Sequence, residues 1–255
     1  MAYELEVAVA KLAAEEAGAL ALDYQRKGVA AEIKADESPV TAADRACEKL
    51  IVETISRQFP DDGVLGEEGA SRTGRSGRKW IIDPIDGTKD FVRGIPLWAV
   101  LIGLEQDGEL IAAAAYCPGQ SLLLHAGKGL GAWANGRPIH VSGSTELNQA
   151  VLSFNGFNKI GVNPFAERII PWAQQFWAVR SLGGAVDAMF LAQGQTDIWI
   201  EPNAQPWDLA ALKLLIEEAG GSFAAFNGKN TIYEGNAYAC TPALERHVFA
   251  LLNGA

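Results

Sequence analysis

The sequence predicts an α/β protein built from two α/β layers that join near residue 145. Helical periodicity fills the first 60 residues, short apolar runs separated by turn signals follow from residue 64 to residue 142, and strand and helix patterns mix after that. With 255 residues, 49% of them hydrophobic and 20% charged, the chain is large enough for one large core or two fused smaller ones. We therefore expect an N-terminal part of helices and antiparallel sheet, residues 1–145, and a C-terminal α/β part, residues 146–255.

Two amphipathic helices are expected to open the chain. The first ends at Gly28, and its apolar residues recur at helical spacing: Leu5, Val9, Leu12, Leu20 and Tyr24. The second lies within SPVTAADRACEKLIVETISRQFP, where Thr41 is placed to cap the first turn and Pro60 follows the end. Its apolar face consists of Leu50, Ile51 and Ile55.

A run of short strands is expected between Val64 and Ser142. The dipeptides Asp107-Gly108 and Asn135-Gly136 are typical of two-residue hairpin turns, so we predict an antiparallel meander. The elements predicted after it are a strand over 150–154, helices over 164–175 and 185–193, a strand in TDIWI, a helix in WDLAALKLLIEEAGG and a short terminal α/β segment.

The formal net charge of −10 limits the partners of the protein. It argues against nucleic acid, because neutralising nucleic-acid phosphates requires clustered Lys and Arg. The same charge disfavours a phosphorylated substrate, unless the acidic residues hold divalent cations that reverse the local field.

The sequence carries no signal for a membrane or for export. No apolar run approaches the roughly 20 residues that span a bilayer, and the N-terminus lacks the basic start and apolar core of a secretory signal. The three cysteines are scattered without a CxxC pair, which suits reduced thiols. We expect a cytoplasmic protein with no membrane partner.

The stretch WIIDPIDGTKDF, residues 80–91, places two aspartates at the end of an apolar run. Asp83 and Asp86 would emerge at the end of a buried strand, ahead of a Gly-Thr turn and a helix whose free N–H groups suit an anion. Carboxylates together with a backbone carbonyl, here that of Ile85, match Mg²⁺ or Ca²⁺ rather than zinc. An Asp-rich turn that caps a helix explains the same spacing, so both interpretations stay open.

Other acidic residues have ordinary explanations when each is taken alone. Glu67 and Glu68 in LGEEG would lie at the mouth of a strand or in a solvated turn. Asp44 fits a capping box with Thr41, and Asp208 in PWDLAA would cap the helix that begins there. No single acid identifies a site.

Taken together, GEEG, WIIDPIDGTKDF and PWDLAALKLLIEEAGG, in this order, resemble the signatures of the inositol monophosphatase superfamily of Mg²⁺-dependent, lithium-sensitive phosphatases. The resemblance runs from SPVTAAD through GLGAWANGRPIHVS to the last helix and implies an αβαβα layered sandwich. DGTKDFVRGIPLWAVLIGL is most similar to the histidinol-phosphatase branch, in which a Lys follows the Thr, so Lys89 argues against inositol 1-phosphate. Asp90 departs from that branch, where Asn is usual.

The resemblance implies two or three Mg²⁺ ions per active site. The implied ligands are Glu67, Asp83, the Ile85 carbonyl, Asp86 and Asp208. Asp83 would bridge two ions, and Glu67 would also support a third through water. Thr88 and Asp44 match the pair that orients and deprotonates the attacking water, and the N–H groups of Gly87 and Thr88 would bind the phosphate.

Further positions match those that face the organic part of the substrate: Gly184, Ala185 and Glu201. Arg93 would approach the phosphate, or the site across a subunit contact, although a solvated surface arginine fits equally well. The resemblance also implies a homodimer, with a contact near Trp172 and Trp177.

We therefore expect a phosphomonoester hydrolase for a small phosphorylated metabolite, with histidinol phosphate, an intermediate of histidine biosynthesis, as the leading substrate. The alternative substrates are inositol 1-phosphate, 3'-phosphoadenosine 5'-phosphate and fructose 1,6-bisphosphate. From other classes, the alternatives are a non-catalytic metal-binding module and a glycoside hydrolase that works with an acid and base pair and no metal.

Overall fold

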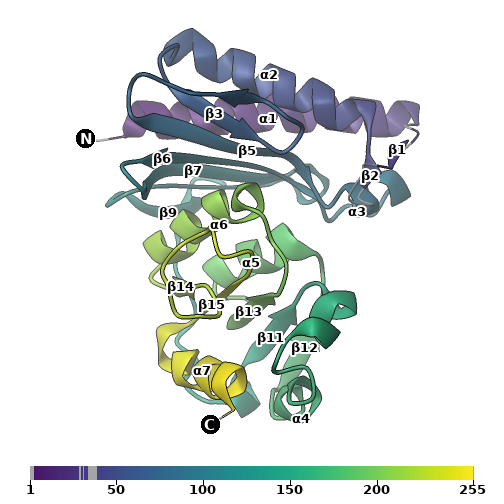
Figure 1. The fold of residues 1–255 in the computed structure, drawn as a ribbon, viewed down its shortest axis with the longest axis vertical. Coiled ribbons are helices and arrows are strands. Elements are labelled where there is room, and N and C mark those ends of the chain that lie inside the picture. The colour runs from purple at the N-terminus through teal and green to yellow at the C-terminus, as the bar shows by residue number, and fades with distance from the viewer. Residues whose placement is uncertain (1–2, 29, 31, 34–38, 255) are drawn as a thin grey trace.

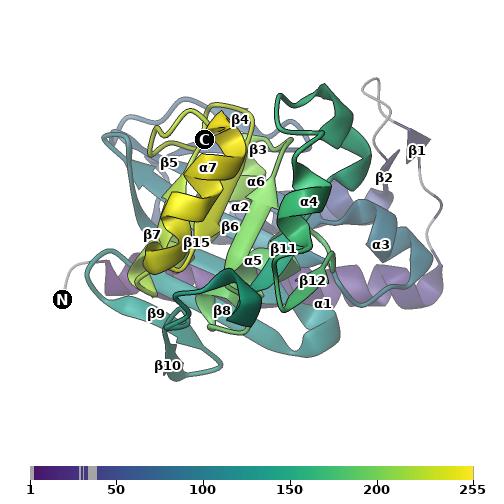
Figure 2. The same ribbon diagram turned by 90° about the horizontal axis from the view of Figure 1, so that it is seen from below.

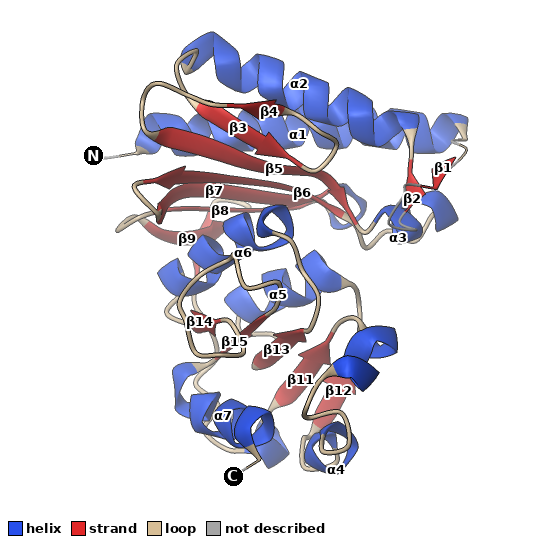
Figure 3. Cartoon of the chain, viewed as in Figure 1, coloured by secondary structure: helices blue, strands red, loops and turns tan. Residues whose placement is uncertain are grey.

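The computed structural model describes residues 3–28, 30, 32–33 and 39–254. Over these residues the chain forms five layers, in which helices lie above, between and below two large sheets (Figure 1; Figure 3). This arrangement confirms the predicted α/β layered sandwich. The α-helices are α1 Glu4–Lys27, α2 Ala42–Gln58, α3 Thr88–Arg93, α4 Ile169–Ala173, α5 Gly184–Ala192, α6 Pro206–Glu218 and α7 Glu245–Asn253.

The upper sheet has eight strands in the order β10-β9-β8-β7-β6-β5-β3-β4. Its strands are β3 Gly63–Gly66, β4 Ser71–Arg72, β5 Arg78–Asp86, β6 Ala99–Gln106, β7 Glu109–Cys117, β8 Leu122–Gly127, β9 Gly131–Ala134 and β10 Arg137–Ile139. From β5 to β10 the strands form the predicted antiparallel meander. At the other edge the prediction was wrong, because β3 pairs with β5 in parallel, with Val64 opposite Trp80.

The parallel pair at this edge has a simple topological cause. Strand β4 returns antiparallel along the outer side of β3 and ends near the edge where β3 begins, so β5 starts from that edge on the other side of β3 and runs parallel to it. As a result β3 and β5 end at the same edge of the sheet, which brings the residues that follow them together.

The lower sheet has five strands in the order β12-β11-β13-β15-β14. Its strands are β11 Val151–Phe154, β12 Ala178–Arg180, β13 Ile198–Glu201, β14 Ser222–Ala224 and β15 Ala237–Cys240. Seen from below, α7 and α4 lie on its outer face (Figure 2). A small separate pair is formed by β1 Glu32–Ile33 and β2 Pro39–Val40.

Helix α1 lies where the sequence predicts it, but its buried face differs from the expected one. Leu5 and Leu12 are 56% and 49% exposed, whereas the buried positions are mostly alanines. The reason is close packing: a Cβ at Gly18 would lie only 2.6 Å from the Tyr116 ring of β7. Small residues therefore face the sheet and α2, and Leu5 and Leu12 stay outside.

Helix α4 is much shorter than the predicted segment 164–175. Turns precede it, and it covers only Ile169–Ala173. Pro171 has no N–H to donate to residue 167, so the helix cannot extend further towards its N-terminus with regular hydrogen bonds. Trp172 packs edge to face on Phe176, and Trp177 is 73% exposed. The homodimer contact expected near these two tryptophans stays a prediction.

Helices α5 and α6 form the middle layer and pack on both sheets. One continuous core joins residues of the upper sheet, these two helices and the lower sheet, including Leu101, Met189, Leu212 and Trp199. The chain passes from one sheet to the other between Ile139 and Val151.

The middle layer contacts the upper sheet very closely at one point. A Cβ added to Gly103 of β6 would lie 2.8 Å from the Cβ of Ala210 in α6. The backbone of α6 therefore rests almost directly on the backbone of β6. None of the helices in the described ranges has both the length and the apolar content needed to cross a membrane.

Candidate active site

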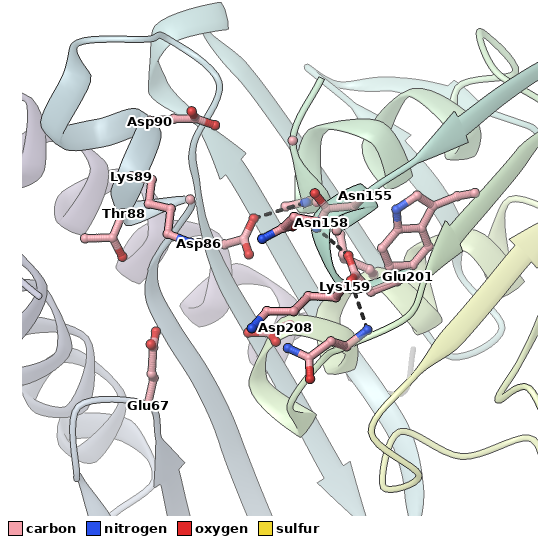
Figure 4. Close-up of a pocket in the computed structure, with 18 residues that line it drawn as sticks. Glu67, Asp86, Thr88, Lys89, Asp90, Asn155, Asn158, Lys159, Glu201 and Asp208 are labelled. Carbon is pink, nitrogen blue, oxygen red and sulfur yellow. Dashed lines mark hydrogen bonds between the residues drawn. The ribbon is translucent and has the colours of Figure 1, made fainter. Parts of the chain in front are cut away.

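A cavity of about 450 Å³ opens at the edge of the upper sheet where β3 and β5 end, and it extends to the lower sheet (Figure 4). Glu67 and Thr88 lie on one side of the cavity, and Asn155 and Glu201 lie on the other. The sequence-predicted residues that line it are Glu67, Asp86, Gly87, Thr88, Gly184, Ala185, Glu201 and Asp208.

Three aspartates form a compact cluster, and two of them, Asp86 and Asp208, line this cavity. Asp83, Asp86 and Asp208 each place a carboxylate oxygen within 4.8 Å of the others. Each carboxylate is oriented by a backbone N–H, which comes from Ile85 for Asp83 (2.9 Å), from Ala185 for Asp86 (3.0 Å) and from Gln205 for Asp208 (2.7 Å). An all-oxygen cluster of this kind fits a hard cation such as Mg²⁺ or Ca²⁺.

The end of β5 explains how two aspartates three residues apart share this cluster. In a regular strand, residues separated by three positions point to opposite faces of the sheet. The pairing of β5 with β6 shifts register between Asp83 and Asp86, so the regular alternation is broken at this point. Both carboxylates therefore reach the same aspartate cluster.

Glu67 reaches the cluster because β3 and β5 are parallel. It follows the last residue of β3, and its N–H donates a hydrogen bond to the Ile82 carbonyl of β5 at 3.1 Å. Its charge adds to the field that acts on Asp83, Asp86 and Asp208.

Burial and crowding raise the pKa values of these acids. Burial, followed by the charge of Glu67, raises the pKa of Asp83 well above its ordinary value. Burial raises the pKa of Asp86 to about 6, and burial with the charge of Asp86 raises that of Asp208 to about 7. Across the cavity, burial raises the pKa of Glu201 to about 8. A cluster in which the ionised acids destabilise one another is suited to binding a cation.

These pKa values predict how the stability of the metal-free protein depends on pH. Unfolded carboxyl groups titrate near pH 4, whereas Asp86, Asp208 and Glu201 titrate at about 6, 7 and 8 in the fold. Between about pH 4 and about pH 8 these three groups hold more protons in the folded protein than in the unfolded chain. Raising the pH through this range therefore lowers the free energy of unfolding. In EDTA, the melting temperature should fall by at least about 5 °C from pH 5 to pH 8.

The matched variants for this measurement are Asp208→Asn and Asp23→Asn. Asp208→Asn removes one titrating group and should flatten the pH profile of the melting temperature. Asp23 lies on α1 and forms an exposed ion pair with Lys27, so Asp23→Asn should leave the profile unchanged. A wild-type melting temperature that is constant or rises over this range would contradict the effect of the crowded acids.

Asp44 lies in the first turn of α2 and is fully buried. One oxygen, Oδ2, accepts hydrogen bonds from the Thr41 N–H (2.8 Å) and hydroxyl (2.5 Å), which completes the predicted capping box of α2. The other oxygen, Oδ1, faces the Thr88 hydroxyl at 3.4 Å. Burial raises the pKa of Asp44, so the side chain both caps the helix and can accept a proton through Thr88.

The turn between β5 and α3 lines the cavity beside Thr88. Gly87 precedes the helix with a φ of 89°, and a Cβ there would lie 3.3 Å from the Trp98 side chain. Only glycine adopts this conformation at little cost. The first N–H groups of a helix have no partner within the helix, so this turn offers donors to an anion.

The far side of the cavity is built from the start of α5 and the end of β13. Glu201 is 4% exposed, and its carboxylate accepts hydrogen bonds from the Asn155 side-chain amide (2.6 Å) and the Asn203 N–H (3.3 Å). A Cβ at Gly184 would lie 3.1 Å from the Asn155 amide, so glycine keeps this side open. Arg93 is exposed in the last turn of α3 and does not line the cavity.

Several lining residues were not predicted from the sequence. They are Lys89, Asp90, Asn155, Gly156, Asn158, Lys159, Gly183, Trp199, Asn203 and Leu212. Residues 155–159 directly follow β11, and ligands of α/β sheets tend to bind beyond the carboxyl ends of strands. Their position directly after a predicted strand was the one sequence signal that could have identified residues 155–159.

The chain is similar to known proteins over most of its length. The family model of the inositol monophosphatase family matches residues 2–253. A histidinol-phosphatase of Mycobacterium tuberculosis is 40% identical over 87% of this chain and 87% of its own length, and one of Chlorobaculum parvum is 36% identical over 94% and 93%. A fructose-1,6-bisphosphatase/inositol-1-monophosphatase of Thermotoga maritima is 34% identical over 78% and 74%.

Solved structures give the same result for the fold. An inositol monophosphatase from Anabaena (Nostoc) sp. PCC 7120 superposes with a TM-score of 0.87 and 30% identity, covering 100% of this chain and 98% of its own. The match therefore extends over both sheets and over every part of the chain that lines the cavity. The chain belongs to the inositol monophosphatase family of phosphatases.

Proposed function

We propose that this protein is a Mg²⁺-dependent phosphomonoester hydrolase whose substrate is L-histidinol phosphate. The observation that carries the hydrolase proposal is that the aspartate cluster and the Asp44–Thr88 pair both reach one cavity, through Asp86, Asp208 and Thr88. The similarity to histidinol-phosphatases over most of the chain supports the choice of substrate.

Two or three Mg²⁺ ions would be held by Glu67, Asp83, the Ile85 carbonyl, Asp86 and Asp208. Bound there, Mg²⁺ would neutralise the phosphate oxygens and lower the pKa of a water molecule. The donors are all oxygen atoms, which agrees with the preference of Mg²⁺.

The protein's own groups would then orient and deprotonate the attacking water. The Thr88 hydroxyl lies between the cavity and Asp44 Oδ1, so it can accept a proton from water and donate its own to Asp44. The water oxygen forms a bond to phosphorus as the bond to the substrate's alcohol oxygen breaks. That oxygen takes up a proton from solvent, and Asp44 later releases to solvent the proton it received. The products are the alcohol and inorganic phosphate.

The organic part of the substrate would contact the far side of the cavity. Glu201 is the buried carboxylate there, and a positively charged ammonium group would favour its ionised form. Histidinol phosphate carries such a group, whereas the alternative substrates offer hydroxyl groups or a second phosphate. This difference favours histidinol phosphate.

A phosphate-release panel tests the proposal. L-histidinol phosphate, inositol 1-phosphate, 3'-phosphoadenosine 5'-phosphate and fructose 1,6-bisphosphate are compared at saturating Mg²⁺, with and without EDTA. We expect the highest kcat/KM for histidinol phosphate and no turnover in EDTA. A higher value for another ester would refute the substrate, and no Mg²⁺-dependent turnover on any of the four would refute the hydrolase.

Glu201→Gln should lower kcat/KM for histidinol phosphate by about 10- to 100-fold, the usual worth of a hydrogen bond to a charged group. The substitution keeps the shape of the side chain and removes its charge. For inositol 1-phosphate, which has no ammonium group, kcat/KM should change by less than about fivefold. Equal losses on both substrates would show that Glu201 does not select for the ammonium group.

A further inference from the structure

Glu48 is a buried acid that none of the predicted roles uses. It lies on α2 and is 5% exposed. Burying a carboxylate is costly unless hydrogen bonds replace the lost water, so its partners indicate why it is there.

Both Glu48 oxygens bind the turn that follows Glu67. Oε2 accepts a hydrogen bond from the Glu68 N–H at 2.8 Å, and Oε1 accepts one from the Ala70 N–H at 2.8 Å. The turn closes on itself through a 2.7 Å hydrogen bond from the Gly66 N–H to the Ala70 carbonyl. Such bonds to a charged acceptor are roughly twice as strong as neutral ones.

The turn is fixed from the opposite side as well. The Glu67 N–H donates to the Ile82 carbonyl, which continues the parallel pairing of β3 and β5. The backbone of Glu67 is therefore held between β5 and the Glu48 carboxylate.

Gly66 shows how closely the carboxylate fits against this turn. A Cβ on Gly66 would lie 2.1 Å from Glu48 Oε2, a distance that no real pair of atoms of this kind tolerates. The Glu48 carboxylate occupies the space of a side chain at position 66. The glycine before Glu67 and the acid on α2 are complementary.

We propose that Glu48 is a positioning residue that holds the turn carrying the metal ligand Glu67. The inference rests on the proposed function, in which Glu67 binds Mg²⁺. Asp44 and Glu48 are four residues apart on one face of α2. One helix thus positions both the proton acceptor of the reaction and a metal ligand.

Two variants of Glu48 separate its geometry from its charge. Glu48→Gln keeps the length of the side chain but turns an NH₂ group toward one of the two backbone N–H donors. Glu48→Asp keeps the charge but is one methylene too short to reach both donors. The control is Glu53→Gln, which removes an exposed charge from the same helix.

Mg²⁺ binding is measured by titration calorimetry in the absence of substrate, together with thermal melts that verify folding. Both Glu48 variants should weaken Mg²⁺ binding by about 10- to 100-fold, the usual effect of losing a group that supports a metal ligand. Glu53→Gln should bind as wild type does. In a Glu67→Ala background, the Glu48 substitutions should change the affinity by less than about twofold, because the ligand they position is gone.

The result that overturns the proposal is wild-type Mg²⁺ affinity in a folded Glu48 variant, or an undiminished loss in the Glu67→Ala background. Should Glu48→Gln not fold, Glu48→Asp decides alone. A wild type that binds Mg²⁺ but releases phosphate from no ester would refute the proposed function and leave the calorimetric test of Glu48 intact.

Discussion

Replacing Asp83 with asparagine should reduce Mg²⁺-dependent phosphate release by more than about 10³-fold. Asp83 is the most buried member of the aspartate cluster, and it lies within 4.8 Å of both Asp86 and Asp208 through its carboxylate. An amide offers one neutral oxygen in place of two charged ones, so it cannot bridge two cations. The loss should exceed the 10- to 100-fold that follows removal of a group that only supports a ligand. Initial rates over a range of Mg²⁺ concentrations measure it.

Glu68→Gln is the matched control for this variant. Glu68 is adjacent to Glu67, but the contact to Glu48 uses its backbone N–H, which the substitution keeps. Its activity should stay within about threefold of wild type. Asp83→Asn should remain folded in the absence of metal. Burial disfavours the ionised Asp83 carboxyl and raises its pKa, whereas the amide of asparagine carries no charge. Near-wild-type turnover in Asp83→Asn would rule out Asp83 as the bridging ligand.

Replacing Thr88 with alanine should lower kcat by about 10²- to 10⁴-fold, the usual contribution of a positioned proton-transfer group. Thr88 is the residue whose hydroxyl connects the cavity with Asp44. KM should change much less, because the backbone N–H groups of the turn and the metal ligands remain. Steady-state kinetics on the best substrate of the panel separate the two effects.

Thr88→Ser provides the control, since serine keeps the hydroxyl and loses only a methyl group. It should recover most of the activity that alanine loses. If Thr88→Ala instead raised KM and left kcat intact, Thr88 would bind phosphate and take no part in proton transfer.

The sequence was most informative where the signal is local. Thr41 and Asp44 identified the start of α2, because a capping box depends only on residues three positions apart. Much of the buried face of α1 was missed because alanine carries little hydrophobic signal. The need for small residues comes from close packing that only the fold shows, as between Gly18 and Tyr116. The parallel pairing of β3 with β5 depends on the path of the chain around β4, which no local pattern records.

The same limit applies to the candidate site. Asp83, Asp86 and Asp208 each belong to a short sequence motif. The family resemblance linked these motifs, although they are far apart in the chain. Asn155 directly follows β11, and Lys159 lies in a short 3₁₀ helix, Phe157–Val162. No motif marks either residue in the sequence, so their place in the cavity follows only from how the lower sheet meets the upper one. Glu48 was missed because it acts on backbone N–H groups, whose partners a sequence does not reveal.

The close contact between Gly103 and Ala210 determines which parts of this site can change in sequence without moving the aspartate cluster. Ala210 lies two residues after Asp208, so a side chain at position 103 would push the Asp208 carboxylate away from the upper sheet. Metal–ligand distances tolerate only about 0.2 Å, so this backbone contact would act as a fixed spacer for the proposed metal ligands. Asn155, Lys159 and Asn203, on the other side of the cavity, lie in the segments that follow β11 and β13, and segments that connect strands and helices accept substitutions and insertions readily. A fold of this design can acquire a new leaving-group specificity through loop changes while its hydrolytic centre stays the same.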